Sequence, residues 1–214
     1  MYGIITHMGI PSVSGVLCAF YGMEKCGGRQ RDMVYDEAKR SITADRLLLR
    51  PFREADAERV AELCSNDNLY RSVLSLPRPY TVECARTWMA AHEENFSAGR
   101  SYEFAVTDGA AGCLYGCIGL FCHSRDRNAE IGYWMGEEYW GNGYATEAAR
   151  AVVEFAFRCK GLHRVYARHF ASNPASGRIM QKCGMVYEGT MKEHIFKDGR
   201  YEDLVCYGLL NPAE

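Results

Sequence analysis

The chain has 214 residues, of which 48% are apolar and 24% are charged, a composition typical of a soluble globular protein with a sizeable core. Its formal charge of −2 gives no electrostatic basis for binding nucleic acid or an anionic membrane. Ten cysteines are about 5% of the chain, fewer than a disulfide-stabilised secreted scaffold carries. We therefore expect reduced cysteines and a cytoplasmic protein.

The first 23 residues contain no Asp, Glu, Lys or Arg, as a signal peptide core or a membrane segment also would. However, no positively charged region precedes the apolar part, and glycine, proline and serine interrupt it well before membrane-spanning length. Residues 24–41 are polar and of mixed charge, which is typical of a linker. We expect a flexible or loosely docked extension over residues 1–41 and one folded domain over residues 42–212.

From residue 42 onward, short β-type runs are interspersed with amphipathic helical segments. Strands are predicted at residues 44–52, 102–107, 113–122, 129–135, 163–170, 186–196 and 201–209. Helices are predicted at residues 54–63, 81–97, after the glycine loop to residue 160, and from residue 173. Asp108-Gly109 and residues 197–200 fit hairpin turns. This order predicts a mixed sheet covered by helices and lacks the alternation of a doubly wound nucleotide fold.

Three cysteines, Cys113, Cys117 and Cys122, fall within one predicted strand. The first two share a face of that strand and the third does not, so their spacing is poor for a zinc site. Buried, reduced cysteines are the better interpretation, and we expect no metal.

The stretch W-G-N-G-Y-A at residues 140–145 joins an alternating strand to an amphipathic helix. In the strand, Ile131, Tyr133 and Met135 face one way, and Glu130, Gly132 and Trp134 the other. The apolar stripe of the helix consists of Ala148, Val152, Ala156 and Cys159. Two glycines at such a junction let backbone N–H groups converge on a ligand, and the helix N-terminus adds its dipole. The junction is therefore suited to a phosphate or pyrophosphate, although a plain tight turn has the same pattern.

The segment N-P-A-S-G at residues 173–177 opens a short helix. Asn173 is a good N-cap, Pro174 suits the first helical position, and Gly184 can end the helix, so these three residues need no function. Ser176 and Gly177 are poor helix formers that this punctuation does not explain. A serine hydroxyl beside a cleft at a strand end can exchange hydrogen bonds with a ligand.

Together these motifs resemble the GNAT N-acetyltransferases, and most closely the branch of the ribosomal-protein N-terminal acetyltransferases RimJ and RimL. The resemblance covers residues 42–210 in the right order and spacing. It rests on L-L-L-R-P-F at 47–52, E-I-G-Y-W-M at 130–135, W-G-N-G-Y-A-T-E-A at 140–148, N-P-A-S at 173–176, K-C-G-M-x-x-E-G at 182–189 and D-G-R-Y-E-D at 198–203.

The resemblance implies an α+β fold with a mixed, mostly antiparallel sheet of six to seven strands, and acetyl-CoA in a V-shaped opening between two parallel strands. It implies an acetyl-CoA-dependent N-acetyltransferase that acts on a primary amine in a ternary complex, first of all on a protein or peptide N-terminal α-amine. A small amine (a polyamine, an amino acid or an antibiotic) and a catalytically silent acyl-CoA-binding module remain alternatives. A Rossmann enzyme is disfavoured, because Gly141-x-Gly143 lacks the third glycine and the ribose-binding acid. Monomer and homodimer both stay open.

In the family, the first parallel strand pairs with the pantetheine arm and the glycine loop holds the pyrophosphate. The loop pattern is Gln/Arg-x-x-Gly-x-Gly/Ala, which Gly143 and Ala145 match and Trp140 does not. Phosphate binding is therefore expected to rest mostly on backbone N–H groups. The resemblance assigns acetyl-CoA contacts to Ile131, Tyr133, Trp134, Met135, Trp140, Gly141, Asn142, Gly143, Tyr144, Ala145, Thr146, Asn173 and Ser176.

For catalysis, many relatives use a tyrosine at the position of Met180, which cannot donate a proton. In the branch most resembled here, the serine matching Ser176 serves the departing thiolate, and we assign Asn173 to positioning the pantetheine or a water. Glu130 and Glu103 are the candidate bases, with a slight preference for Glu130.

On the acceptor side, the resemblance places specificity in residues 53–98 and 192–201. It suggests that the acceptor is lined by four polar residues of the last two strands, Tyr187, Glu188, Tyr201 and Asp203. We interpret His169 and His194 as structural or exposed, although each could supplement a base.

Overall fold

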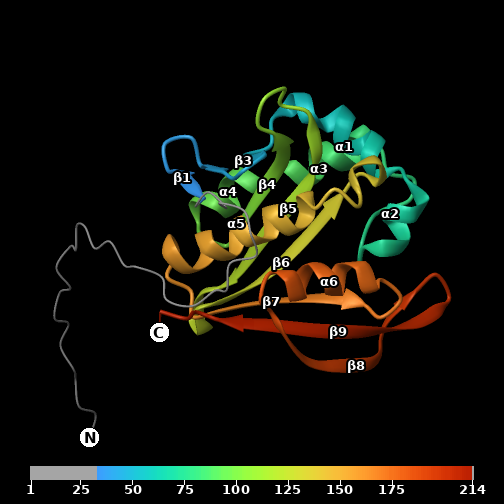
Figure 1. Cartoon of the computed structure of the whole chain (residues 1–214). Coiled ribbons are helices and arrows are strands. Elements are labelled where there is room, and N and C mark those ends of the chain that lie inside the picture. Colours follow the sequence, from blue (N-terminus) through green and yellow to red (C-terminus); the bar gives the residue numbers. More distant parts are fainter. Residues whose placement is uncertain (1–32, 214) are drawn as a thin grey trace, which may run out of the picture. The chain divides into compact units, whose positions relative to one another are not determined.

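The computed structural model describes residues 33–213, and within this range nine strands form one sheet in the order β1-β2-β3-β4-β5-β6-β7-β9-β8 (Figure 1). The sheet is mixed and mostly antiparallel, as expected, with nine strands rather than six to seven. The strands are β1 Val34–Asp36, β2 Ser41–Thr43, β3 Leu47–Arg50, β4 Ser101–Asp108, β5 Leu114–His123, β6 Asn128–Met135, β7 Arg164–Phe170, β8 Val186–Lys197 and β9 Arg200–Leu210.

Six α-helices and three 3₁₀ helices complete the described part of the chain. The α-helices are α1 Ala57–Cys64, α2 Asp67–Ser72, α3 Val82–Met89, α4 His92–Ser97, α5 Tyr144–Arg158 and α6 Pro174–Lys182. The 3₁₀ helices are η1 Glu54–Asp56, η2 Ser124–Asp126 and η3 Glu137–Tyr139. Within the described residues, no helix is long and apolar enough to cross a membrane.

The N-terminal edge of the sheet corrects the linker expected over residues 24–41. Tyr35 of β1 pairs with Ile42 of β2, and its ring lies against Phe155 of α5 with centroids 4.8 Å apart. Ile42 is fully buried. The linker prediction is therefore wrong over residues 34–41, where two apolar anchors in a polar stretch are enough to add a hairpin to the sheet. The rest of the expected extension, residues 1–32, lies outside the described residues.

Helices cover both faces of the sheet, because the side chains of β4 alternate between two cores. Phe104 and Val106 belong to the core that α5 covers, whereas Ala105 belongs to the core that α1 and α3 cover. Figure 1 shows α5 lying across the sheet. Ala148, Val152 and Ala156 form its buried stripe as predicted.

Three details of the helices differ from the sequence prediction. Cys159 caps α5 beyond its last helical residue and is exposed, so it is not part of the stripe. The helix expected over residues 81–97 is two helices, because Ala85 of α3 packs in one core while Phe96 of α4 packs on Tyr102 in the other. Helix α2 had no counterpart in the prediction. Its N-cap is Asn66, whose side chain accepts hydrogen bonds from two backbone N–H groups at 2.9 Å.

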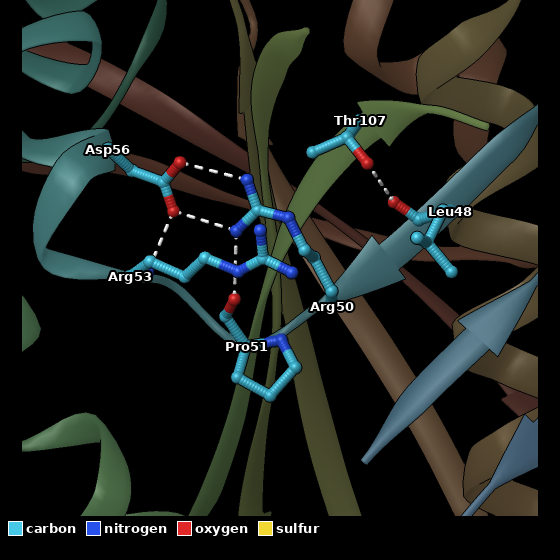
Figure 2. A network of polar contacts seen from close by, with 6 residues as sticks. All are labelled: Leu48, Arg50, Pro51, Arg53, Asp56 and Thr107. Carbon is cyan, nitrogen blue, oxygen red and sulfur yellow. Dashed lines mark hydrogen bonds and ion pairs between the residues drawn. The ribbon is translucent and has the colours of Figure 1, made fainter. Parts of the chain in front are cut away.

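A buried ion pair fixes the connection from β3 to α1 (Figure 2). Two guanidinium nitrogens of Arg50 lie 2.7 and 2.8 Å from the two carboxylate oxygens of Asp56, which also accepts from the backbone N–H of Arg53 at 2.7 Å. Both charged side chains are buried. Burial alone would raise the pKa of Asp56, but these donors outweigh it and hold the pKa below its usual value. Nearby, Thr107 donates to the carbonyl oxygen of Leu48 at 2.7 Å and ties β4 to β3.

The two parallel strands β6 and β7 separate after a short contact. They pair only from Asn128 to Glu130, against Arg164 to Tyr166. Beyond Glu130, β6 stays paired with β5, and β7 stays paired with β9. The edge of β6 from Ile131 to Met135 therefore has no strand partner on the β7 side, which opens a V-shaped gap at the middle of the sheet.

Candidate active site

Two adjoining cavities lie at the opening between β6 and β7. The first, which we call the loop cavity, has a volume of about 620 Å³ and is bounded by the glycine loop, α2 and α6. The second, the acid cavity, has a volume of about 640 Å³ and contains Glu103 and Glu130 in its wall. The residues that line both are Ser72, Val73, Tyr133, Trp134 and Ser176. The two cavities therefore meet at Tyr133 and Ser176.

The glycine loop has the backbone that its sequence predicts. Gly141 and Gly143 have φ angles of 77° and 81°, a region that favours glycine. Gly143 is the N-cap of α5 and provides no side-chain cap, so the first N–H groups of this long helix face the loop cavity without a side-chain acceptor. Together with the helix dipole they form a site for an anion.

The side chains of Trp140 and Asn142 both hold this loop in place, although only Trp140 also lines the loop cavity. The indole N–H of Trp140 donates to the carbonyl oxygen of Met135 at 2.7 Å and ties the loop to the end of β6. The side chain of Asn142 donates to the carbonyl oxygen of Trp140 at 3.1 Å, and Asn142 does not line the loop cavity. Arg46 donates to the carbonyl oxygen of Asn142 at 3.1 Å and pairs with Glu147 at 2.8 Å. The other predicted loop residues, Trp140, Gly141, Gly143, Tyr144, Ala145 and Thr146, all line the loop cavity.

Three cations of the loop cavity were missed by the sequence analysis. Arg71 of α2, together with Arg178 and Lys182 of α6, lines the cavity, and none of the three pairs with an acid among residues 33–213. Most other arginines of the described chain are ion-paired, so three free cations in one cavity favour an anionic ligand. The i,i+4 spacing of Arg178 and Lys182 was a usable signal, since it places both on one helix face. Arg71 gave no signal, because its helix was not predicted.

The segment that opens α6 places its serine against a tyrosine of β6. Ser176 Oγ lies 2.8 Å from the hydroxyl oxygen of Tyr133, which also donates to the Ser176 carbonyl oxygen at 3.1 Å. Asn173 caps the helix by accepting from the Ser176 N–H at 3.4 Å and donates to the Ser72 carbonyl oxygen at 3.2 Å, which links α6 to α2. Met180 is buried.

Gly177, which helix punctuation did not explain, has a packing reason. A Cβ at this position would lie 2.7 Å from Nε2 of His169, closer than the two groups can approach. His169 is a buried wall residue of the acid cavity, and its Nδ1 lies 2.7 Å from the carbonyl oxygen of Phe170. Its ring stacks on Tyr207 with centroids 5.8 Å apart, a packing contact that is consistent with a structural role for His169.

The two candidate bases differ in their surroundings. Both carboxylate oxygens of Glu130 accept from Arg168, each at 2.8 Å. Glu103 is 8% exposed, and its Oε1 accepts from Ser101 at 2.8 Å, while its Oε2 has no hydrogen-bond partner among the described residues. Burial raises the pKa of Glu103 and outweighs the hydrogen bond from Ser101, which lowers it. The geometry therefore favours Glu103 over Glu130, against the slight preference drawn from the sequence.

The polar residues suggested for the acceptor side line neither cavity. Glu188 pairs with Arg164 at 2.6 Å, and Asp203 pairs with Lys192 at 2.7 Å. Tyr187 and Tyr201 are exposed, and His194 is also exposed outside both cavities. Instead, the acid cavity is walled by the segment from Ser72 to Trp88, within the expected range 53–98, and of residues 192–201 only Arg200 touches a cavity. β8 and β9 pair with each other, and β9 also pairs with β7.

Residues 33–213 contain no cluster of side chains suited to holding a metal ion. The cysteines of this range are free, and no three His, Cys, Asp or Glu side chains gather as a metal site would require. Of the three cysteines predicted to be buried in one strand, Cys117 is buried and Cys122 is partly buried in β5, whereas Cys113 precedes β5 and is exposed. Burial raises the pKa of the Cys117 thiol, in keeping with an inert buried residue.

Comparison with known proteins agrees with this geometry. The family model described as an acetyltransferase (GNAT) domain matches residues 46–186. The chain is 30% identical over 174 residues to the uncharacterised N-acetyltransferase YoaA of Bacillus subtilis, covering 81% of this chain and 98% of that protein. It is 25% identical over 176 residues to the [ribosomal protein uS5]-alanine N-acetyltransferase of Escherichia coli, covering 80% and 91%. The crystal structure of a GNAT-family acetyltransferase from Bacillus anthracis superposes with a TM-score of 0.71 at 30% identity, covering 80% and 98%.

Proposed function

Because this chain belongs to the GNAT family of acetyltransferases, we propose that it transfers the acetyl group of acetyl-CoA directly to the α-amine at the N-terminus of a protein or peptide. The observation that carries this proposal is the junction of two cavities at Ser176, beside the unpaired edge of β6. Two adjoining cavities allow donor and acceptor to be bound together, as direct transfer requires.

The loop cavity fits acetyl-CoA. Its glycine loop and the N-terminus of α5 suit the pyrophosphate, and the unpaired edge of β6 offers backbone groups to the amides of the pantetheine arm. Arg71, Arg178 and Lys182 add positive charge for the phosphates. This charge is available at a site where Trp140 takes the place of the Gln or Arg of the family pattern.

The acid cavity fits the amine. Glu103 offers one unpaired carboxylate oxygen in a buried wall, where it can accept the proton that the amine loses, directly or through a water. At the junction itself, the Ser176 hydroxyl can donate a hydrogen bond to the departing sulfur. A catalytically silent binding module would need neither group at this junction.

The chemistry of deprotonation favours an α-amine over a lysine. An α-amine with a pKa of about 7.7–8.0 costs about 1 kcal/mol to deprotonate at pH 7, whereas a lysine with a pKa of about 10.4 costs about 4.6 kcal/mol. Glu103 is the sole carboxylate of this wall, among the described residues, that is both buried and free of a cation. The name of the uS5-alanine N-acetyltransferase gives the same acceptor class for a relative.

The test is to incubate the protein with acetyl-CoA and three acceptors and to measure the release of CoA. The acceptors are a peptide with a free N-terminal alanine and no lysine, a peptide with a blocked N-terminus and one lysine, and spermidine. We expect turnover with the first and acetylation at its N-terminus by mass spectrometry. Turnover confined to spermidine or to the lysine peptide would overturn the α-amine assignment, and CoA binding without any turnover would indicate the silent module.

A further inference from the structure

Tyr133 makes a contact that its expected part in the site does not require. The resemblance assigns its backbone to the pantetheine arm, yet its phenol oxygen lies 2.8 Å from Ser176 Oγ. The residue lines both cavities, so its side chain forms part of the wall between donor and acceptor. The Tyr133 hydroxyl has no hydrogen-bond partner outside Ser176 among the described residues.

The contact between Tyr133 and Ser176 has two hydroxyl hydrogens, and their number limits which hydrogen bonds it can donate. Ser176 and Tyr133 each carry one hydroxyl hydrogen, and an oxygen that accepts one hydrogen can still donate its own. If the serine donates to the tyrosine, its only hydrogen is used. If the tyrosine donates to Ser176 Oγ, the serine hydrogen is free to point to a third atom. The sulfur of the leaving thiolate is that atom when it develops charge in the loop cavity.

We propose that Tyr133 is the positioning residue that orients the Ser176 hydroxyl toward the leaving sulfur. This inference rests on the proposed function, because it concerns the same transfer. When the thiolate forms, the Tyr133 hydroxyl rotates and changes its hydrogen-bond acceptor. It then donates to Ser176 Oγ, 2.8 Å away, instead of to the Ser176 carbonyl oxygen, 3.1 Å away. The serine then donates to the sulfur, and its oxygen is stabilised by the hydrogen bond from behind.

The step balances without a proton from Tyr133. The lone pair of the amine forms the new C–N bond, the C–S bond breaks with its electron pair on sulfur, and the proton of the amine passes to Glu103. Thiols and phenols have reference pKa values of about 8.5 and 10, so a thiolate does not deprotonate a phenol. Burial raises the pKa of Tyr133 further and keeps it a hydrogen-bond donor.

The position of Tyr133 also explains how this chain manages with Met180. Met180 lies on α6, is 2% exposed and has no hydrogen to donate. Tyr133 brings a phenol from β6, on the opposite wall, to the serine one turn earlier on the same helix. Tyr133 of β6 thus supplies the phenol hydroxyl that α6 lacks at Met180.

The experiment measures steady-state acetyl transfer to the peptide with a free N-terminus for Tyr133→Phe, Ser176→Ala and the double variant. We expect Tyr133→Phe to lower kcat about 10-fold, with KM for acetyl-CoA changed less than about 2-fold, because the ring is kept and a hydrogen bond to a charged transition state is lost. Ser176→Ala should lower kcat about 100-fold. The double variant should match Ser176→Ala, because the phenol acts through the serine.

A matched control is Tyr207→Phe, since the Tyr207 hydroxyl also contacts α6, at Gln181 Nε2 3.1 Å away, but lies outside both cavities. It should leave kcat unchanged, and all variants should keep the melting temperature of the wild type within a few degrees. With an active wild type, three results would overturn this inference only. They are an unchanged kcat in Tyr133→Phe, a change in that variant confined to KM or to the melting temperature, and losses of kcat that multiply in the double variant. A wild type without turnover would overturn the proposed function and the inference with it.

Discussion

Two of the three carboxylates that line the acid cavity, Glu103 and Glu130, differ in their hydrogen-bond partners, and this difference favours Glu103 as the proposed base. Arg168 donates a hydrogen bond to each carboxylate oxygen of Glu130 at 2.8 Å, so both oxygens already have a charged partner. Glu103 is buried with one free oxygen, and burial raises its pKa above the usual value. A carboxylate with a raised pKa is a stronger base and stays within reach of neutral pH.

We expect Glu103→Gln to lower kcat/KM about 100-fold or more at pH 7, because general-base catalysis contributes about 10²–10⁴. Protonation of the substrate amine lowers kcat/KM with decreasing pH in both proteins. In the wild type kcat/KM should fall more steeply below the raised pKa of Glu103, and this steeper part should disappear in the variant. Initial rates from pH 5 to 8 with the free N-terminal peptide provide the measurement. The matched variant Glu130→Gln should lose less activity; if it lost more than Glu103→Gln, the assignment of the base would be reversed.

The Arg50–Asp56 pair lies at the connection from β3 to α1 (Figure 2). Helix α1 packs in the core on the sheet face opposite α5. We expect Asp56→Asn to lower the free energy of unfolding by about 3–5 kcal/mol, because Arg50 is left buried without its counter-charge. Urea unfolding at pH 7 measures this loss. In the neighbouring exposed pair of Arg86 and Glu54, Glu54→Gln should cost less than about 1 kcal/mol. Equal losses in the two variants would show that burial does not set the strength of these pairs.

Elements with a strong local signal were predicted, and elements held by distant contacts were not. The glycine loop, the capped α6 and the long strands carry their own periodicity and turn residues, so their positions followed from sequence. Helix α2 buries mainly Leu69 and has no apolar stripe, and β1 depends on its contact with α5. The preference for Glu103 over Glu130 as the proposed base depends on Arg168, which lies beside Glu130 because of the register between β6 and β7. Such pairings arise from topology, which periodicity does not encode.

For the molecule as a whole, the dependence of stability on pH combines groups that act in opposite directions. Burial lowers the pKa of His92 to about 4, below the value of 6.5 that it has when unfolded. Between these values the unfolded chain binds a proton that the folded chain does not, so stability falls as the pH falls. Glu103 acts in the opposite sense, because its raised pKa makes stability fall as the pH rises above 4.5. The lowered pKa of Asp56 matters below its unfolded value of 3.8.

His92 is therefore best isolated by comparing the wild type with a variant that cannot titrate there. Its ring lies edge-on to Trp88 with centroids 4.5 Å apart, and neither ring nitrogen has a hydrogen-bond partner among the described residues. The wild type should lose about 2 kcal/mol of unfolding free energy between pH 6.5 and pH 4, less than the full linkage value because the side chain is partly exposed. We expect His92→Phe to keep the packing and not to show this loss. Urea unfolding of both proteins at pH 7, 5.5 and 4.5 measures the difference. If the two curves ran parallel across this range, His92 would have to be hydrated in the folded state.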